Sequence, residues 1–130
     1  SKDMLQQANN RLRNQPGIIL LEQAYGDEFY TWTGKLDAIL FSYSLTMINP
    51  QWKALINQAY KDLRPGGYLA VVDFHNSKVP FFKRHMSGHH VRMDGHLLPV
   101  LEDNFQPVMA KVKQAYLGVW EYFLFVGKKI

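Results

Sequence analysis

Polar side chains follow two apolar runs of this chain, at the points where each run could end as a buried strand. The hydroxyl residues of Ser42–Ser44 come directly after the run Leu36–Phe41, and Asp73 and His75 lie at the end of a second run, Tyr68–Phe74. Hydroxyl, carboxylate and imidazole groups together can hold a polar ligand and move a proton, since the pKa of histidine lies near neutral pH. The same residues could equally be ordinary polar residues at strand-to-loop junctions.

The segment between the two runs predicts the element that positions both groups of polar residues. Asn49 can cap a helix, and Pro50 suits its first position. Apolar residues then recur at intervals of three and four, which indicates one buried helical face. These residues are Trp52, Leu55, Ile56, Ala59, Tyr60 and Leu63. Pro65-Gly66-Gly67 should end the helix. Two buried strands joined by one helix form a parallel βαβ unit, and ligands of such sheets bind beyond the carboxyl ends of the strands.

The rest of the chain predicts further elements of an α/β fold. Helices are expected over Ser1–Arg13 and Leu97–Asn104, and a short strand over Ile18–Glu22. Two more runs, Met109–Tyr116 and Val119–Lys128, predict an antiparallel hairpin. Both faces of the last strand are apolar, so we expect it inside the sheet with helices on both sides.

Two motifs of the βαβ unit resemble class I S-adenosylmethionine-dependent methyltransferases. They are the loop Ser42-Tyr43-Ser44-Leu45-Thr46-Met47 and the turn Leu63-Arg64-Pro65-Gly66-Gly67 before Val71-Val72-Asp73-Phe74. The segments FSYSLTM and VVDFH together resemble most closely the betaine-lipid N-methyltransferases, which trimethylate diacylglyceryl-homoserine. The phospholipid N-methyltransferases resemble the chain next most closely. The resemblance implies a Rossmann-like three-layer sandwich with a mostly parallel sheet that ends in an antiparallel hairpin. It also implies S-adenosylmethionine as cofactor and an amine acceptor on a lipid headgroup.

The resemblance further implies which residues contact the cofactor. These are Met4 in the first helix, Gln23, Ala24 and Tyr25 near the adenine, and Ser42, Tyr43 and Ser44 at the methionine end. Family members often place an acidic residue against the adenine; Gln23 departs from this pattern, although its amide oxygen could accept the same hydrogen bond. None of the nine glycines forms a Gly-x-Gly cluster. The glycine-rich cofactor loop is therefore absent from this chain.

Because this loop is missing, we expect residues 1–130 to form a single truncated methyltransferase domain, namely the C-terminal portion of the complete domain. In the family's sheet, two absent strands would lie between Ile18–Glu22 and Leu36–Phe41, leaving both with bare edges. Three outcomes are open: the remaining residues exist outside this chain, a partner supplies strands, or the two strands pair directly.

Methyl transfer from a sulfonium requires mainly positioning and exclusion of water, because the sulfonium is already a good electrophile. An amine acceptor must present a free lone pair, so Tyr43 and His75 are the candidate catalytic residues that orient the amine or accept its proton. The candidates for binding the acceptor are Asp73, His75, Lys83, Arg84 and His89.

Residues 76–96 form a basic, aromatic and histidine-rich stretch that the resemblance implies is a substrate-facing insertion. Its Lys and Arg residues alternate with Phe81, Phe82 and Met86. Such a pattern is typical of a segment that meets lipid phosphates at a membrane surface, although a solvated loop would look the same. His85 and His89 have the spacing of a zinc-ligand pair, but Gly88 interrupts the helix and no H-E-x-x-H pattern occurs. No metal site is predicted.

Composition excludes several classes of protein. The chain has no cysteine, so it has no disulfide or thiolate site. No apolar run approaches the ~20 residues needed to cross a bilayer. The formal net charge of +4 is too small to indicate a nucleic-acid partner.

We expect a cytoplasmic protein with a peripheral membrane contact, and a homo-oligomer remains open. The alternative functions are methylation of a small soluble metabolite or quinone, and a non-catalytic binding module on the same fold.

Overall fold

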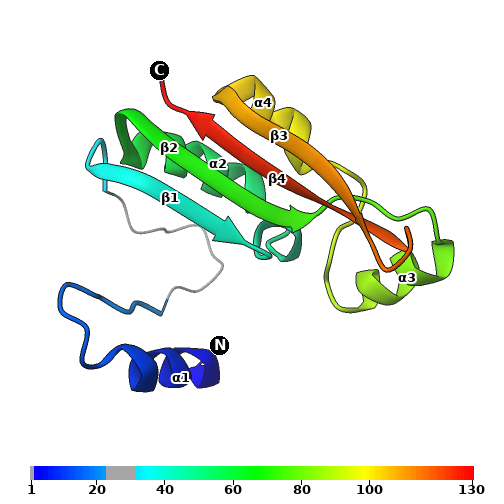
Figure 1. Cartoon of the computed structure of the whole chain (residues 1–130), viewed down its shortest axis with the longest axis horizontal. Coiled ribbons are helices and arrows are strands. Elements are labelled where there is room, and N and C mark those ends of the chain that lie inside the picture. The colour runs from blue at the N-terminus through cyan, green and yellow to red at the C-terminus, as the bar shows by residue number, and fades with distance from the viewer. Residues whose placement is uncertain (1, 23–31) are drawn as a thin grey trace. The chain divides into compact units, whose positions relative to one another are not determined.

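The computed structural model describes residues 2–22 and 32–130 (Figure 1). The chain divides into two compact units, Ser1–Tyr30 and Thr31–Ile130.

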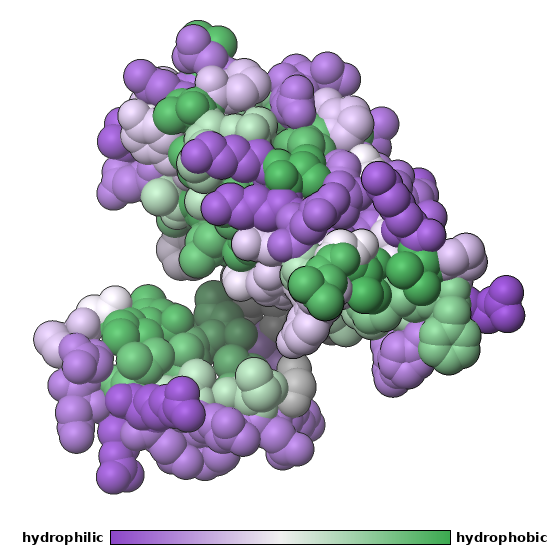
Figure 2. Space-filling view, turned by 45° about the vertical axis from the view of Figure 1, so that its right-hand side comes forward, coloured by the Kyte–Doolittle hydropathy of each residue, from purple (hydrophilic) through white to green (hydrophobic). Residues whose placement is uncertain are grey.

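The first unit contains the predicted N-terminal helix but not the predicted strand. Helix α1 spans Lys2–Leu12 and buries none of its residues. Residues 18–22 form no strand, and Ile19 is 75% exposed. A strand needs a neighbour for its backbone N–H and C=O groups, and residues 2–22 contain no strand that could pair with it. The predicted strand over Ile18–Glu22 is therefore wrong. Apolar side chains gather on one side of this unit in the space-filling view (Figure 2).

The second unit is built on a four-stranded mixed sheet. Its strands are β1 (Leu36–Ser42), β2 (Leu63–Phe74), β3 (Gln106–Ala115) and β4 (Trp120–Lys128), in the order β1-β2-β4-β3. β1 and β2 are parallel, whereas β4 is antiparallel to both β2 and β3. The predicted parallel pair and the predicted closing hairpin are thus confirmed, and β4 lies inside the sheet. β1 is an edge strand, and its outer edge has no partner strand among residues 32–130.

Helix α2, Trp52–Asp62, joins the parallel strands as expected, but its start differs from the prediction. Gln51 precedes the helix and makes no side-chain capping hydrogen bond. Asn49 instead donates through Nδ2 to the carbonyl oxygen of Thr46 at 2.9 Å, and the Asn49–Pro50 peptide bond is cis. Asparagine side chains readily bond to nearby backbone groups, and here that tendency closes the turn before α2 rather than capping the helix.

The Pro65-Gly66-Gly67 segment lies inside β2 and does not form a turn before it. The pairing with β1 shifts register in this region, and Gly66 has a φ of +80°. A Cβ on Gly67 would lie 3.0 Å from the carbonyl oxygen of Asp37. The strand therefore begins at Leu63, earlier than predicted, because the glycines let the two backbones approach closely.

Helices α2 and α4 (Leu97–Asn104) pack on the same face of the sheet, behind the strands in Figure 1. That face carries Phe123 and Phe125 of β4, both buried. The core comprises Leu45, Ile56, Ala59, Leu63, Leu69, Val71, Leu97, Leu101, Phe105, Phe123 and Phe125. The opposite face of β4 is half-buried. Helices on both sides of β4, as the sequence predicted, are therefore not found within this unit.

Helix α3, Pro80–Gly88, follows β2 and lies beside the turn between β3 and β4 (Figure 1). It occupies part of the predicted insertion over residues 76–96. No helix in the described part of the chain is both long and apolar enough to cross a membrane.

Candidate functional site

The carboxyl ends of β1 and β2 meet at one edge of the sheet, where a ligand was expected. Ser42 pairs with Val72 in the last rung of the parallel ladder, and the Tyr43 amide donates to the Val72 carbonyl at 2.8 Å. Tyr43 has a φ of 48°, so the chain turns sharply away from the sheet at this residue. Ser42 and Tyr43 are exposed and Ser44 is half-buried. Their hydroxyl groups thus lie beside an accessible edge.

Asp73 occupies a structural position, not the ligand-binding position expected of it. Its side chain is fully buried. Thr46 donates to the carboxylate twice, from Oγ1 at 2.7 Å and from its backbone amide at 3.2 Å, and the Phe74 amide donates at 2.8 Å. Burial raises the pKa of Asp73, and these hydrogen bonds offset the rise only in part. The carboxylate therefore holds the short 3-10 helix η1, Leu45–Met47, against β2.

The two candidate catalytic residues lie on opposite faces of the sheet. The Tyr43 ring contacts Phe74 at a centroid distance of 5.1 Å, and Phe74 in turn contacts Trp120. The His75 ring instead contacts Phe123 of the core face at 6.0 Å. Successive side chains of a strand alternate between faces, which separates Phe74 from His75. The structure therefore does not bring Tyr43 and His75 together.

Neither residue has the environment of a strong base at the sheet edge. Burial raises the pKa of Tyr43, and the nearby Tyr122 and Asp73 raise it further. The phenol thus stays protonated at neutral pH and can donate a hydrogen bond. His75 lines a separate cavity of about 430 Å³, together with Asp94 and Glu102. Its Nδ1 is buried without a hydrogen-bond partner.

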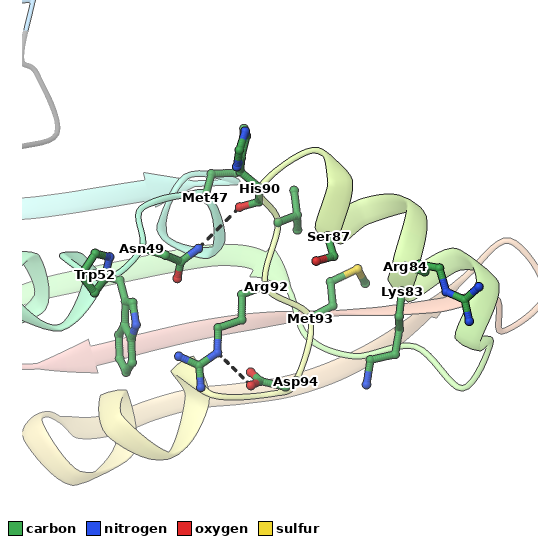
Figure 3. Close-up of a pocket in the computed structure, with 12 residues that line it drawn as sticks. Met47, Asn49, Trp52, Lys83, Arg84, Ser87, His90, Arg92, Met93 and Asp94 are labelled. Atoms are coloured by element: carbon green, nitrogen blue, oxygen red, sulfur yellow. Dashed lines mark hydrogen bonds and ion pairs between the residues drawn. The ribbon is translucent and has the colours of Figure 1, made fainter.

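A larger cavity, of about 670 Å³, opens between the loop after β1 and the α3 segment (Figure 3). It is lined by Met47, Asn49, Pro50, Trp52, Lys83, Arg84, Ser87, His90, Val91, Arg92, Met93 and Asp94. Two of the predicted acceptor-binding residues, Lys83 and Arg84, are among them. His89 is not, because its ring packs against His85 at 4.8 Å. Figure 3 shows Lys83 extending from α3 toward Met93 and Asp94, whereas Arg84 points away.

Sequence reasoning did not select His90 and Arg92 as site residues. Arg92 donates from Nε to Asp94 Oδ2 at 2.8 Å, and its guanidinium lies 5.9 Å from the centre of the Trp52 ring. The basic composition of residues 76–96 was the available signal. Only the folded chain places Trp52, which precedes this stretch by a whole strand, beside Arg92.

A histidine–aspartate pair supports the wall of this cavity. Asp94 Oδ1 lies 2.7 Å from His96 Nδ1. Burial alone would raise the pKa of Asp94, but the hydrogen bond from Arg92 and the charges of His96 and Arg92 lower it overall. Burial lowers the pKa of His96, and the charge of Arg92 lowers it further. With its pKa lowered, His96 is neutral and carries its one N–H on Nδ1, which donates to Asp94. Nε2 then carries no hydrogen, and this buried atom has no hydrogen-bond partner.

The predicted contacts to the methionine end of S-adenosylmethionine, Ser42, Tyr43 and Ser44, follow one another at the carboxyl end of β1, and their role stays a prediction. Met4 lies in the first unit and is 66% exposed. The remaining predicted cofactor contacts, Gln23, Ala24 and Tyr25, lie outside the described residues. Within residues 2–22 and 32–130, no group of three or more His, Asp or Glu side chains is placed to hold a metal ion.

Residues 1–116 match the sequence profile of the ubiE/COQ5 methyltransferase family. The chain belongs to this family. No curated protein matches the chain at a significant level.

Solved structures show the same fold for this ubiE/COQ5 family member. An S-adenosylmethionine-dependent methyltransferase from Methanosarcina mazei is 18% identical, with a TM-score of 0.71 over 100% of this chain and 79% of that protein. The N-methyltransferase NodS from Bradyrhizobium japonicum, in complex with S-adenosyl-L-homocysteine, is 16% identical, with a TM-score of 0.74 over 96% of this chain and 61% of NodS. A methyltransferase from Mesorhizobium loti is 15% identical, with a TM-score of 0.74 over 98% of this chain and 77% of that protein.

These matches confirm the predicted Rossmann-like methyltransferase fold. They also confirm S-adenosylmethionine as the cofactor of the family and fold. None of them supports the finer prediction of a betaine-lipid or phospholipid N-methyltransferase.

Proposed function

We propose that this family member transfers methyl groups from S-adenosylmethionine to an amine, and that the acceptor is a lipid headgroup that also carries an acidic group. Two fold neighbours act on nitrogen according to their names: NodS, and a 1,6-didemethyltoxoflavin-N1-methyltransferase from Burkholderia thailandensis. Both are under 25% identical, so they support the fold more than the acceptor.

The observation that carries the proposal is the composition of the cavity of about 670 Å³. Its wall from α3 and the following loop presents Lys83 and Arg92, against a single acidic residue, Asp94, whereas the Arg84 side chain points away (Figure 3). Met47 and Trp52 form an apolar wall on the other side. Cations beside apolar surface suit an amphiphile with a carboxylate or phosphate group. Met47 belongs to the loop that follows Ser42–Ser44, so this cavity adjoins the expected cofactor end.

Each residue then has a positioning role. When bound, S-adenosylmethionine would supply an electrophilic methyl group for in-line displacement by the amine, with the thioether as leaving group and the released amine proton passing to water. Ser42 and Ser44 orient the amino-acid end of the cofactor. The protonated Tyr43 phenol donates a hydrogen bond at the same edge. Lys83 and Arg92 hold the acidic group of the acceptor, and no strong base is required because an amine with a free lone pair attacks directly.

The test is transfer of a tritiated methyl group from S-adenosylmethionine, catalysed by the protein that carries this chain. The acceptors are phosphatidylethanolamine and diacylglyceryl-homoserine in mixed micelles, compared with soluble phosphoethanolamine. Lys83→Gln should raise KM for the lipid roughly tenfold or more, because it removes a charge-assisted contact of about 1.5–3 kcal/mol. Lys61→Gln, at an exposed position on α2, is the matched control and should leave KM unchanged. Label in a soluble acceptor, with none in lipid, would overturn the proposal.

A small soluble metabolite or quinone is the second candidate acceptor. In favour of such an acceptor, one fold neighbour, the 1,6-didemethyltoxoflavin-N1-methyltransferase from Burkholderia thailandensis, is solved with bound 1,6-didemethyltoxoflavin. Methylation of a soluble hydroquinone in the same assay would select this candidate.

A non-catalytic binding module is the third candidate, favoured by the absent glycine-rich loop. Calorimetric titration of the protein with S-adenosylmethionine separates it from both enzymes. Cofactor binding with no methyl transfer to any acceptor, or no cofactor binding at all, would select the module.

A further inference from the structure

Four large side chains project into solvent at one end of the second unit. Val79 and Phe81, at the start of α3, are 36% and 77% exposed. Tyr116 and Leu117, in the turn between β3 and β4, are 77% and 108% exposed. We call these four residues the apolar tip. Exposed apolar side chains that cluster in this way mark a surface that meets a partner or a membrane.

Several contacts fix the two segments of the apolar tip beside each other. Ser77 Oγ donates to the Val119 carbonyl, and the Glu121 amide donates to the Asn76 carbonyl at 2.7 Å. Phe82 faces Trp120 with nearly parallel rings. Figure 1 shows α3 next to the β3–β4 turn. The apolar tip is thus one surface, although its two halves lie far apart in the sequence.

The turn holds its two apolar residues outward by its backbone conformation. Tyr116 and Leu117 have φ values of 51° and 57°, in the left-handed region that non-glycine residues rarely adopt. A turn of this kind ordinarily carries Asn or Gly. Neither residue is buried in return, so the sequence keeps two large apolar side chains at a position where folding does not require them.

Cations predominate around the apolar tip, and Glu121, in the first turn-proximal rungs of β4, is the acidic residue beside it. Residues 76–93 and 105–120 contain no Asp or Glu. Their Lys and Arg residues are Lys78, Lys83, Arg84, Arg92, Lys111 and Lys113. The space-filling view, which brings this end forward, shows apolar and hydrophilic side chains side by side there (Figure 2). Aromatic and aliphatic residues rimmed by cations are typical of surfaces that enter the headgroup region of anionic bilayers.

We propose that the apolar tip docks the protein on a membrane that contains anionic lipid. Phe81 and Leu117 enter the boundary between headgroups and acyl chains, while Lys78 and Lys113 contact lipid phosphates. This inference deepens the proposed function, because a lipid acceptor has to be reached at a bilayer surface. The insertion predicted over residues 76–96 thereby supplies only half of the surface, and the hairpin supplies the other half.

The test is co-sedimentation of the full chain with large vesicles of phosphatidylcholine, with and without phosphatidylglycerol. We expect binding to the anionic vesicles and at least roughly tenfold weaker binding to pure phosphatidylcholine, since each cation near an anionic surface contributes about 1 kcal/mol. Phe81→Ser combined with Leu117→Asn should weaken anionic binding roughly tenfold or more, because two apolar side chains lose their membrane contact. Val108→Ser is the matched control, since Val108 is 61% exposed near the opposite end of β3. It should bind as the unaltered chain does.

Two results would overturn the inference. One is equal vesicle binding by the double variant and the unaltered chain; the other is no vesicle binding by either. Loss of a dimer in the double variant, measured by sedimentation velocity, would instead assign the apolar tip to a second copy of the chain. Methyl transfer to a lipid amine in detergent micelles needs no bilayer, so its outcome tests the proposed function separately. Circular dichroism of the variants confirms that both remain folded, as expected for substitutions at exposed positions.

Discussion

The hydroxyl of Thr46 donates a 2.7 Å hydrogen bond to Asp73 Oδ1, and both side chains are fully buried. This bond joins the loop after β1 to the end of β2, two segments whose sequences carry the methyltransferase resemblance. Asp73 was expected to contact the acceptor. The structure assigns it the task of holding the loop Ser42–Met47 in place at the sheet edge, where the hydroxyls of Ser42 and Tyr43 face outward.

Thr46→Val should destabilise the fold without changing the shape of the side chain. Valine keeps the volume but removes the donor to a buried carboxylate, a contact of about 1.5–3 kcal/mol. Urea denaturation followed by circular dichroism measures the change. Thr33→Val, at an exposed turn position, should stay within about 0.5 kcal/mol of the unaltered chain. Equal stability of both variants would show that the Thr46–Asp73 bond does not stabilise the loop.

Gly127→Ala should lower the free energy of unfolding by about 1–3 kcal/mol, because it overpacks the junction of β4 and α4. A Cβ at this position would lie 2.6 Å from Phe105 Cβ and 2.6 Å from the Phe125 ring. Gly88→Ala is the matched control, since nothing lies within 4 Å of a Cβ there. That control should be neutral, or stabilising by up to about 1 kcal/mol, because Gly88 ends α3. Thermal melts should therefore show a lower Tm for Gly127→Ala and an unchanged or higher Tm for Gly88→Ala, each compared with the unaltered chain.

His96 should make the protein less stable as the pH falls below neutrality. Its pKa in the folded chain is lowered from the ordinary 6.5, so between these two values the unfolded chain binds a proton that the folded chain does not. The free energy of unfolding is therefore not reduced by His96 above the pKa that this histidine has in the unfolded chain, and it falls as the pH drops below that pKa. Asp73 acts in the opposite sense at more acidic pH, because its pKa is raised. Urea midpoints from about pH 7.5 to about pH 5.5 measure the trend.

His96→Asn separates this effect from other acid-dependent changes. Asparagine can still donate to Asp94 but does not titrate, so the variant should lose stability less steeply over the same pH range. His85→Asn, an exposed position on α3, is the matched control and should keep the original slope. The same slope in all three proteins would contradict a titrating role for His96.

His75→Ala should lower turnover by less than roughly tenfold, a barrier change under ~1.4 kcal/mol. The reason is that His75 faces the core side of the sheet, whereas Tyr43 faces the other side. Tyr43→Phe should lower kcat more than His75→Ala, since it removes the hydroxyl of the phenol that follows β1. The tritium-transfer assay measures both. A larger loss for His75→Ala would restore His75 as a catalytic residue and would require the acceptor to reach the core side.

Several features of the fold could be predicted from the sequence because they depend on local patterns. The spacing of apolar residues in Trp52–Asp62 predicted α2, and the apolar runs around Leu117 predicted the hairpin. In each case neighbouring residues carry the signal, since helix and strand periodicities repeat every few residues.

Where the sequence prediction failed, contacts between distant segments decided the outcome. Ile18–Glu22 has strand composition, but residues 2–22 contain no second strand to pair with its backbone. Asn49 could have capped a helix through Oδ1, yet its Nδ2 donates to the Thr46 carbonyl and α2 begins only at Trp52. The side of the sheet that Tyr43 faces depends on a left-handed backbone turn, which residue types at this position do not predict.

Local sequence patterns were enough to predict α2 between two parallel strands, the hairpin that closes the sheet, and the net positive charge of residues 76–96. Contacts between distant segments enclose Asp73 with Thr46, place Trp52 and Arg92 in one cavity, and set Phe82 against Trp120. Secondary structure follows from hydrogen bonds and side-chain periods within short segments. A site depends on which distant segments the packed core brings together, and that requires the whole folded unit.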